Sequence, residues 1–141
     1  MNRIILVGAP EPWERFARPI LEEEEKIPTV SFAEERDLLD STLAGTITSE
    51  DLMVLSPTKG RLPSAELAPM FHRLGPVRVL VVDGRFDYMR MGDAVRGCAV
   101  GYEAMPWNRE KLIELVETYD ELEPPDRSAI DRRFGPWRTA I

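Results

Sequence analysis

The stretch 77–112 constrains the fold more than any other part of this chain. It contains two apolar runs, 77–82 and 98–102, which are rich in valine and bounded by glycine, aspartate and proline, as short buried strands are. The residues between them, 88–95, have room for one short helix. A proline-containing loop then leads to Asn108, a good helix N-cap. This order of strand, helix, strand, loop and helix predicts the closing half of an open parallel α/β sheet.

The rest of the chain continues the alternation of strand and helix signals. Three further apolar runs predict strands at 3–7, 29–32 and 51–55. The remaining helices are expected over about 12–25, 34–43 (capped by Gly45), 64–73 and 108–122. Prolines at positions 19 and 69 fall inside two of these helices, where they should kink or interrupt them. The pattern predicts a flavodoxin-like five-stranded parallel sheet in the order 2-1-3-4-5, with helices on both faces.

Length and composition narrow the class of protein. A chain of 141 residues is long enough for one domain with its own core. Its formal net charge of −7 argues against nucleic-acid binding, which needs clustered Lys and Arg. The single cysteine, Cys98, fits a reducing compartment and is expected to be an inert thiol buried in a strand. Because the apolar runs are too short to span a bilayer, we expect a cytoplasmic protein that binds neither nucleic acid nor membrane.

The stretch 77–112 resembles the end of the receiver domain of bacterial response regulators. In that family, a strand carrying a threonine is followed by a helix, an aromatic residue, a Lys-Pro pair and the last helix. Here Tyr102 and Pro106 stand at the aromatic and proline positions, Met105 stands at the lysine position and Asp83 at the threonine position. The resemblance covers roughly 1–122 and implies a CheY-like fold, a cis Met105–Pro106 bond and a C-terminal extension at 123–141.

The resemblance also identifies five positions of the family's phosphorylation pocket. In receivers, two acidic residues and an acceptor aspartate hold Mg²⁺, while a hydroxyl and a lysine contact the phosphoryl group. The matching residues here are Gly8, Ala9, Ser56, Asp83 and Met105. Because Mg²⁺ prefers carboxylate oxygens and methionine supplies no charge, none of the five is suited to its role. The resemblance therefore implies a degenerate pseudo-receiver that is not an enzyme and holds no metal or cofactor.

A receiver docks partners and self-associates largely through the face made by its fourth helix, fifth strand and fifth helix. By resemblance, this face comprises Arg90, Met91, Asp93, Arg96, Tyr102, Trp107 and Glu110. Met91 and Trp107 are the expected anchors, because methionine and aromatic side chains are enriched in interface cores. We expect a protein partner, or a homodimer formed through this face.

The extension 123–141 carries two large aromatic residues, Phe134 and Trp137, which favour burial. A turn of helix is expected at 128–133. Two interpretations stay open for the extension: a strap that packs its aromatics on the domain, or a short partner-binding motif.

Two other functions also stay open. A small ligand could bind in the vacated pocket, since open α/β sheets bind ligands at the C-terminal ends of their strands. An enzyme could have rebuilt a site around Ser56 and Asp83, but a nucleophilic serine needs a base. The one histidine, His72, is expected on a helix surface, remote from Ser56. A dry pocket containing Met105 would favour the interaction function, and a convergent polar cavity would favour the sensor.

Overall fold

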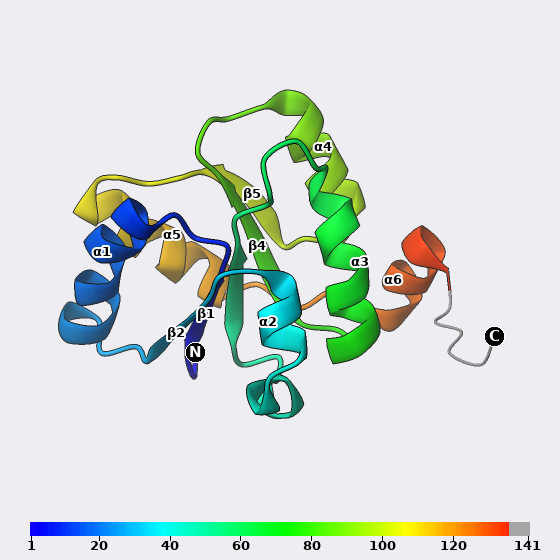
Figure 1. Ribbon diagram of the computed structural model, residues 1–141, viewed down its shortest axis with the longest axis horizontal. Helices are drawn as coiled ribbons and strands as arrows, with labels where there is room; N and C mark the ends of the chain where they lie inside the picture. Colours follow the sequence, from blue (N-terminus) through cyan, green and yellow to red (C-terminus); the bar gives the residue numbers. More distant parts are fainter. Residues whose placement is uncertain (136–141) are drawn as a thin grey trace.

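The computed structural model describes residues 1–135, which form a five-stranded parallel sheet (Figure 1). The strands are β1 (Ile4–Val7), β2 (Thr29–Phe32), β3 (Leu52–Leu55), β4 (Arg78–Asp83) and β5 (Gly101–Ala104). Their order is β2-β1-β3-β4-β5, and every neighbouring pair is parallel. The predicted fold class and strand order are confirmed.

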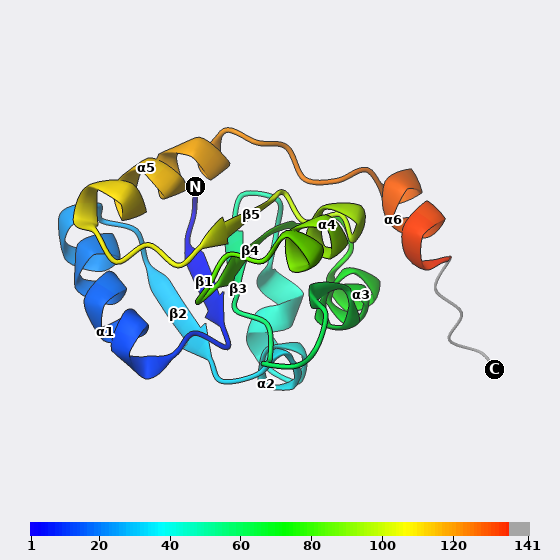
Figure 2. The ribbon, with the colours of Figure 1, turned by 90° about the horizontal axis from the view of Figure 1, so that it is seen from above.

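Helices cover both faces of the sheet (Figures 1 and 2). One face is covered by α1 (Glu11–Pro19) and α5 (Arg109–Asp120), and the other by α2 (Glu35–Leu39), α3 (Pro63–Leu74) and α4 (Tyr88–Arg96). A sixth helix, α6 (Arg127–Phe134), lies beside α3 and α4. Because side chains alternate along each strand, β1 directs Ile4 and Leu6 into the first core and Ile5 and Val7 into the second.

The two prolines inside helices have different effects. Pro19 ends α1, and the chain continues as a π-helical turn, η1 (Ile20–Glu24). Pro69 lies within an uninterrupted α3, so the predicted break there is wrong. Proline cannot donate to the carbonyl four residues earlier. In α3 that carbonyl, on Ala65, accepts instead from the Arg61 guanidinium at 3.3 Å, which replaces the missing helical bond.

The predicted helix over 34–43 is shorter than expected and is followed by a 3₁₀ turn, η2 (Thr42–Thr46). Ser41 lies between the two segments, and its hydroxyl donates to the carbonyl of Leu38 at 2.7 Å. A serine side chain that bonds nearby backbone competes with continued helix. Gly45 therefore lies within η2 and does not cap the helix, as had been predicted.

The loops on either side of β5 also differ from expectation. Cys98 has a φ of 68° and precedes the strand, because β5 begins only at Gly101. No cis peptide bond occurs within residues 1–135, so the predicted cis Met105–Pro106 bond is wrong. The trans form is lower in energy by about 0.5–1 kcal/mol for an X–Pro bond. It is held here by hydrogen bonds from Met105 N to the Asp83 carbonyl and from Trp13 Nε1 to the Pro106 carbonyl, each 2.7 Å long.

The described part of the C-terminal extension packs on the domain. Ile130 is 1% exposed and belongs to the second core. The Phe134 ring lies 6.3 Å from that of Phe71 and 6.4 Å from that of His72, so His72 is half-buried and not a surface residue. These contacts support the strap interpretation as far as Phe134, whereas Trp137 lies outside the described residues. Within 1–135, none of the helices has the length and apolar character needed to cross a membrane.

Candidate functional site

The first pocket position, Gly8, is closed by backbone. Gly8 follows β1 with a φ of +76°, and a Cβ built on it would lie 2.5 Å from the carbonyl oxygen of Ser56. The strand ends are drawn together by the bond from Ser56 N to the Val7 carbonyl at 2.8 Å. An aspartate at position 8 would therefore clash with β3 and adopt a strained φ. Ala9, the second acidic position of the family, packs half-buried against the first core.

Ser56 stands at the acceptor position directly after β3. Its hydroxyl oxygen is buried and has no hydrogen-bond partner among residues 1–135. His72 lies in the last turn of α3 against Phe134, whereas Ser56 precedes the start of that helix. No histidine base contacts the serine, so this arrangement does not form a nucleophile–base pair.

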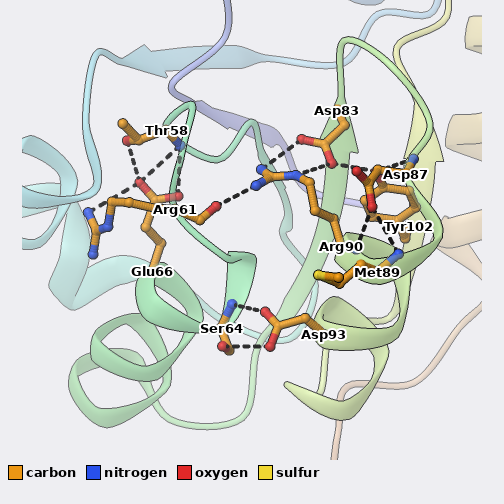
Figure 3. Close-up of polar contacts among 10 residues, drawn as sticks. All are labelled: Thr58, Arg61, Ser64, Glu66, Asp83, Asp87, Met89, Arg90, Asp93 and Tyr102. Carbon is orange, nitrogen blue, oxygen red and sulfur yellow. Dashed lines mark hydrogen bonds and ion pairs between the residues drawn. The ribbon is translucent and has the colours of Figure 1, made fainter.

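Asp83 is the centre of a buried polar network at the end of β4 (Figure 3). The Arg90 guanidinium binds its carboxylate in bidentate fashion, with Nε 2.8 Å from Oδ2 and Nη2 3.0 Å from Oδ1. The Tyr102 hydroxyl also donates to Oδ2 and in turn accepts from Asp87 N at 3.1 Å. Burial, followed by the bond to Asp83, raises the pKa of Tyr102 to about 12. Bonding to Asp83 likewise raises the pKa of Arg90.

The same arginine holds the loop between β3 and α3. Arg90 Nη1 donates to the carbonyl of Arg61, whose own guanidinium lies 3.6 Å from both Glu35 and Glu66. Glu66, 4% exposed, accepts from Thr58 N at 3.1 Å and from Thr58 Oγ1 at 2.7 Å. The loop between β3 and α3, which follows the acceptor position of a receiver, is therefore hydrogen-bonded to α4 through Arg61 and to α3 through Thr58 (Figure 3).

Asp93 of α4 caps the start of α3. Its carboxylate accepts from Ser64 N at 2.7 Å and from Ser64 Oγ at 2.9 Å. The residue at the N-cap of α3, Leu62, has no side-chain acceptor, so Asp93 supplies the cap from a neighbouring helix. Asp93 is 5% exposed and does not reach the outer surface.

The remaining side of the pocket is apolar. Met105 and Trp13 are both buried in the first core. The indole N–H of Trp13 donates a hydrogen bond to the Pro106 carbonyl. Met105, which is 8% exposed, packs in the first core on one side and lines a hollow over β5 and α5 on the other, so the dry pocket expected from the sequence stays a prediction.

The pocket does not fit Mg²⁺. Its strand ends offer one carboxylate, Asp83, and both oxygens of that group are bonded to protein donors. Gly8, Ala9 and Ser56 contribute no carboxylate, and Gly8 has no room for one. Across the described residues, no group of three His, Cys, Asp or Glu side chains is placed to bind a metal.

The surface beside the pocket has a different character. Phe86, Tyr88, Met89 and Trp107 are 43%, 79%, 73% and 55% exposed, respectively. The Phe86 ring makes edge contacts with Tyr88 at 5.0 Å and Tyr102 at 5.2 Å. Phe86 and Trp107 also line a groove of about 680 Å³ that runs over β5 and α5. We refer to Phe86, Tyr88, Met89 and Trp107 together as the aromatic surface.

The residues predicted for the docking face fall into two groups. Arg96, Trp107 and Glu110 are exposed. The others turn inward: Tyr102 and Asp93 are buried, Arg90 binds Asp83, and Met91 packs on the second core. Their expected exposure is therefore not seen, and Met89, not Met91, is the well-exposed methionine of α4.

Sequence reasoning missed the β4–α4 loop. Asp87 caps α4, accepting from Met89 N at 2.9 Å and from Arg90 N at 3.1 Å. An aspartate directly before a helical segment is a readable N-cap signal. The cap fixes where α4 starts and thereby which face of the helix Met89 occupies.

Comparisons with known proteins place the fold. No protein-family model matches the sequence, and neither does any curated protein. A response regulator from Thermotoga maritima superposes with a TM-score of 0.71 at 15% identity, covering 86% of this chain and 99% of that chain. FixJ-N gives 0.67 at 15% identity, covering 86% and 94%. The CheY-like protein TadZ from Pseudomonas aeruginosa PAO1 gives 0.59 at 17% identity, covering 89% and 99%. At these identities the likeness establishes the fold: the chain has the CheY-like fold of a response-regulator receiver domain.

Proposed function

We propose that this chain is a pseudo-receiver, a protein-interaction module of bacterial signalling or regulation that works without phosphorylation. The observation that carries the proposal is a closed pocket next to an open apolar surface. Gly8 is blocked by the Ser56 carbonyl, and Asp83 is neutralised by Arg90. A phosphoryl group would meet an internal carboxylate where the family has a hydroxyl, with no lysine and no metal to balance its charge.

The aromatic surface is the proposed docking site. Aromatic and methionine side chains are enriched among the anchors of protein interfaces. Four of them are exposed here, and two of these, Phe86 and Trp107, line the groove over β5 and α5. The surface is presented in one arrangement, because Tyr102 is held inward by Asp83 and packs against Phe86. A partner would thus bind a preformed surface and would not need a phosphorylated state.

A sensor function would need unpaired polar groups converging on the pocket. Most polar groups there are bonded to one another, and the Ser56 hydroxyl alone does not make a convergent site. The interaction function is therefore favoured over the sensor and the enzyme.

The test compares two surface variants in native extracts and in sedimentation. Trp107→Ala combined with Met89→Ser should abolish capture of a specific partner, or self-association, since each anchor contributes more than about 1 kcal/mol. Leu122→Ser is the matched control, because Leu122 is exposed but does not line the groove. If both variants retain the partner equally, this docking site is wrong.

A further inference from the structure

Three arginines surround a second hollow, which the proposed docking surface does not use. Arg96 comes from the last turn of α4, and Arg132 and Arg133 come from the last turn of α6. Cys98 and Ala129 complete the lining of this hollow, whose volume is about 420 Å³. Because α6 belongs to the C-terminal extension, the hollow exists only where that extension packs beside α4 (Figure 2).

The positive charge in the hollow is largely uncompensated. Arg96 and Arg132 form no hydrogen bond or ion pair with any residue in 1–135. Arg133 makes one long ion pair, 3.9 Å, with Asp93, whose carboxylate already accepts two bonds from Ser64. Cations at helix C-termini are stabilised by the helix dipole. The dipole explains why each arginine lies in the last turn of its own helix. It does not explain why arginines from two helices line one hollow in a chain of net charge −7.

Two further features of the lining agree with an anion site. Burial raises the pKa of the Cys98 thiol, while Arg133 and Arg132 lower it, so their positive field extends into the hollow. On α4, a Cβ at Gly92 would lie 3.1 Å from Arg96 Nη1. Glycine within a helix is destabilising relative to alanine. At this position it leaves room for the Arg96 guanidinium to lie against the helix.

We propose that this arginine site, formed by Arg96, Arg132 and Arg133, binds a phosphoryl group carried by a partner protein or by a small phosphate ester. Guanidinium groups match phosphate oxygens in bidentate geometry. A phosphoryl group carries about −1.5 to −2 charges and three acceptor oxygens, so it can satisfy several arginines together. A single carboxylate would neutralise only one. The site is independent of the aromatic surface and of the closed pocket.

The test is an NMR titration of the full-length protein. The probes are inorganic phosphate, a phosphoserine peptide and the same peptide without phosphate, with sodium chloride at matched ionic strength as a reference. Saturable shifts at Arg96, Cys98 and Arg132 are expected with the two phosphate-containing probes alone. Arg96→Gln and Arg132→Gln should each weaken binding by about tenfold or more, as loss of a charge-assisted hydrogen bond predicts.

Two control variants sharpen the titration. Arg85→Gln removes the same charge from an exposed arginine outside the hollow and should bind like the unmodified protein. Gly92→Ala keeps the charge but displaces the Arg96 guanidinium, so it should bind more weakly while its native spectrum is preserved. A phosphopeptide that binds much more tightly than inorganic phosphate supports a protein carrier, and equal affinities support a small ester. The proposal is overturned if no saturable shift occurs, if chloride produces the same shifts, or if the folded Arg96→Gln/Arg132→Gln double variant binds normally.

Discussion

The ends of the central strands and the surface beside β5 lie close together in this protein, yet they use their side chains in opposite ways. At the strand ends, Asp83, Arg90 and Tyr102 bond to one another, and Met105 and Trp13 fill the apolar side. On the surface next to them, Tyr88 and Met89 leave more than two thirds of their area exposed. The region that performs chemistry in receivers is closed by internal contacts, while the region proposed to bind partners is left open.

Under the proposed function, the pocket has lost more than the ligands of a receiver's phosphorylation site. A pocket with substituted residues could have stayed open, with room for the original side chains to be restored. Here an arginine neutralises the new carboxylate, and a backbone carbonyl occupies the space next to Gly8. Restoring single family residues should therefore damage the fold before it restores any chemistry.

The largest expected effect comes from returning an acid to the first pocket position. Gly8→Asp should destabilise the protein by about 3 kcal/mol or more, because the left-handed φ costs about 1–2 kcal/mol and the clash with Ser56 adds to it. Urea unfolding measures the change. Gly60→Asp is the matched control: Gly60 has a φ of +88° but no atoms near its Cβ position, so only the φ cost should appear. Equal losses in the two variants would show that the pocket is not sterically closed.

The next effect tests whether α6 is part of the folded domain, packed on its second core. Ile130→Ala should cost about 2–4 kcal/mol, since the side chain is 1% exposed within the second core. Val95→Ala, at a residue that is 58% exposed, is the comparison and should change stability little. A similarly small loss at Ile130 would favour the partner-motif interpretation of the extension.

Breaking the internal ion pair should have an intermediate effect. Asp83→Asn should cost about 2 kcal/mol, because it removes the charge that Arg90 and Tyr102 bind in a largely buried site. Thermal unfolding near neutral pH measures the loss, and an unchanged melting temperature would mean that the network does not hold the pocket closed.

The same network gives a signature at high pH. The pKa of Tyr102 is raised to about 12 from an ordinary value of 10.0, so its contribution is complete below pH 10 and is lost as pH rises through about 12. In Tyr102→Phe the alkaline loss of stability should be smaller. Asp83→Asn should lower the Tyr102 pKa toward its ordinary value but not to it, since burial is the larger cause.

The smallest effect is expected on the open surface. Met89→Ser should change the free energy of unfolding by less than about 0.5 kcal/mol, as for other exposed positions away from structural contacts. Chemical denaturation of this variant alongside Asp83→Asn gives the comparison directly. A loss at Met89 comparable to that at Asp83 would mean that the aromatic surface serves the fold and not a partner.

The sequence predicted the parts of this structure that local patterns encode. Valine-rich runs located the strands, whereas the loss of phosphorylation that the residues at positions 8, 56, 83 and 105 indicate stays a prediction. The Asp83–Arg90 pair was not foreseen, since Arg90 looked like a surface residue of α4 and nothing in helical periodicity reveals its partner. The uninterrupted helix at Pro69 depends in the same way on Arg61, a side chain from outside the helix.

The central claim, that the pocket is closed to phosphoryl chemistry, is tested most directly by the melting temperature with beryllofluoride and Mg²⁺. A ligand that bound only the native protein at about a hundred times its dissociation constant would add about 2.7 kcal/mol, an easily measured shift. The account predicts no magnesium-dependent shift with beryllofluoride and no adduct with acetyl phosphate. A magnesium-dependent increase of that size, abolished by Asp83→Asn, would show that Asp83 takes part in a working metal site and would contradict the account.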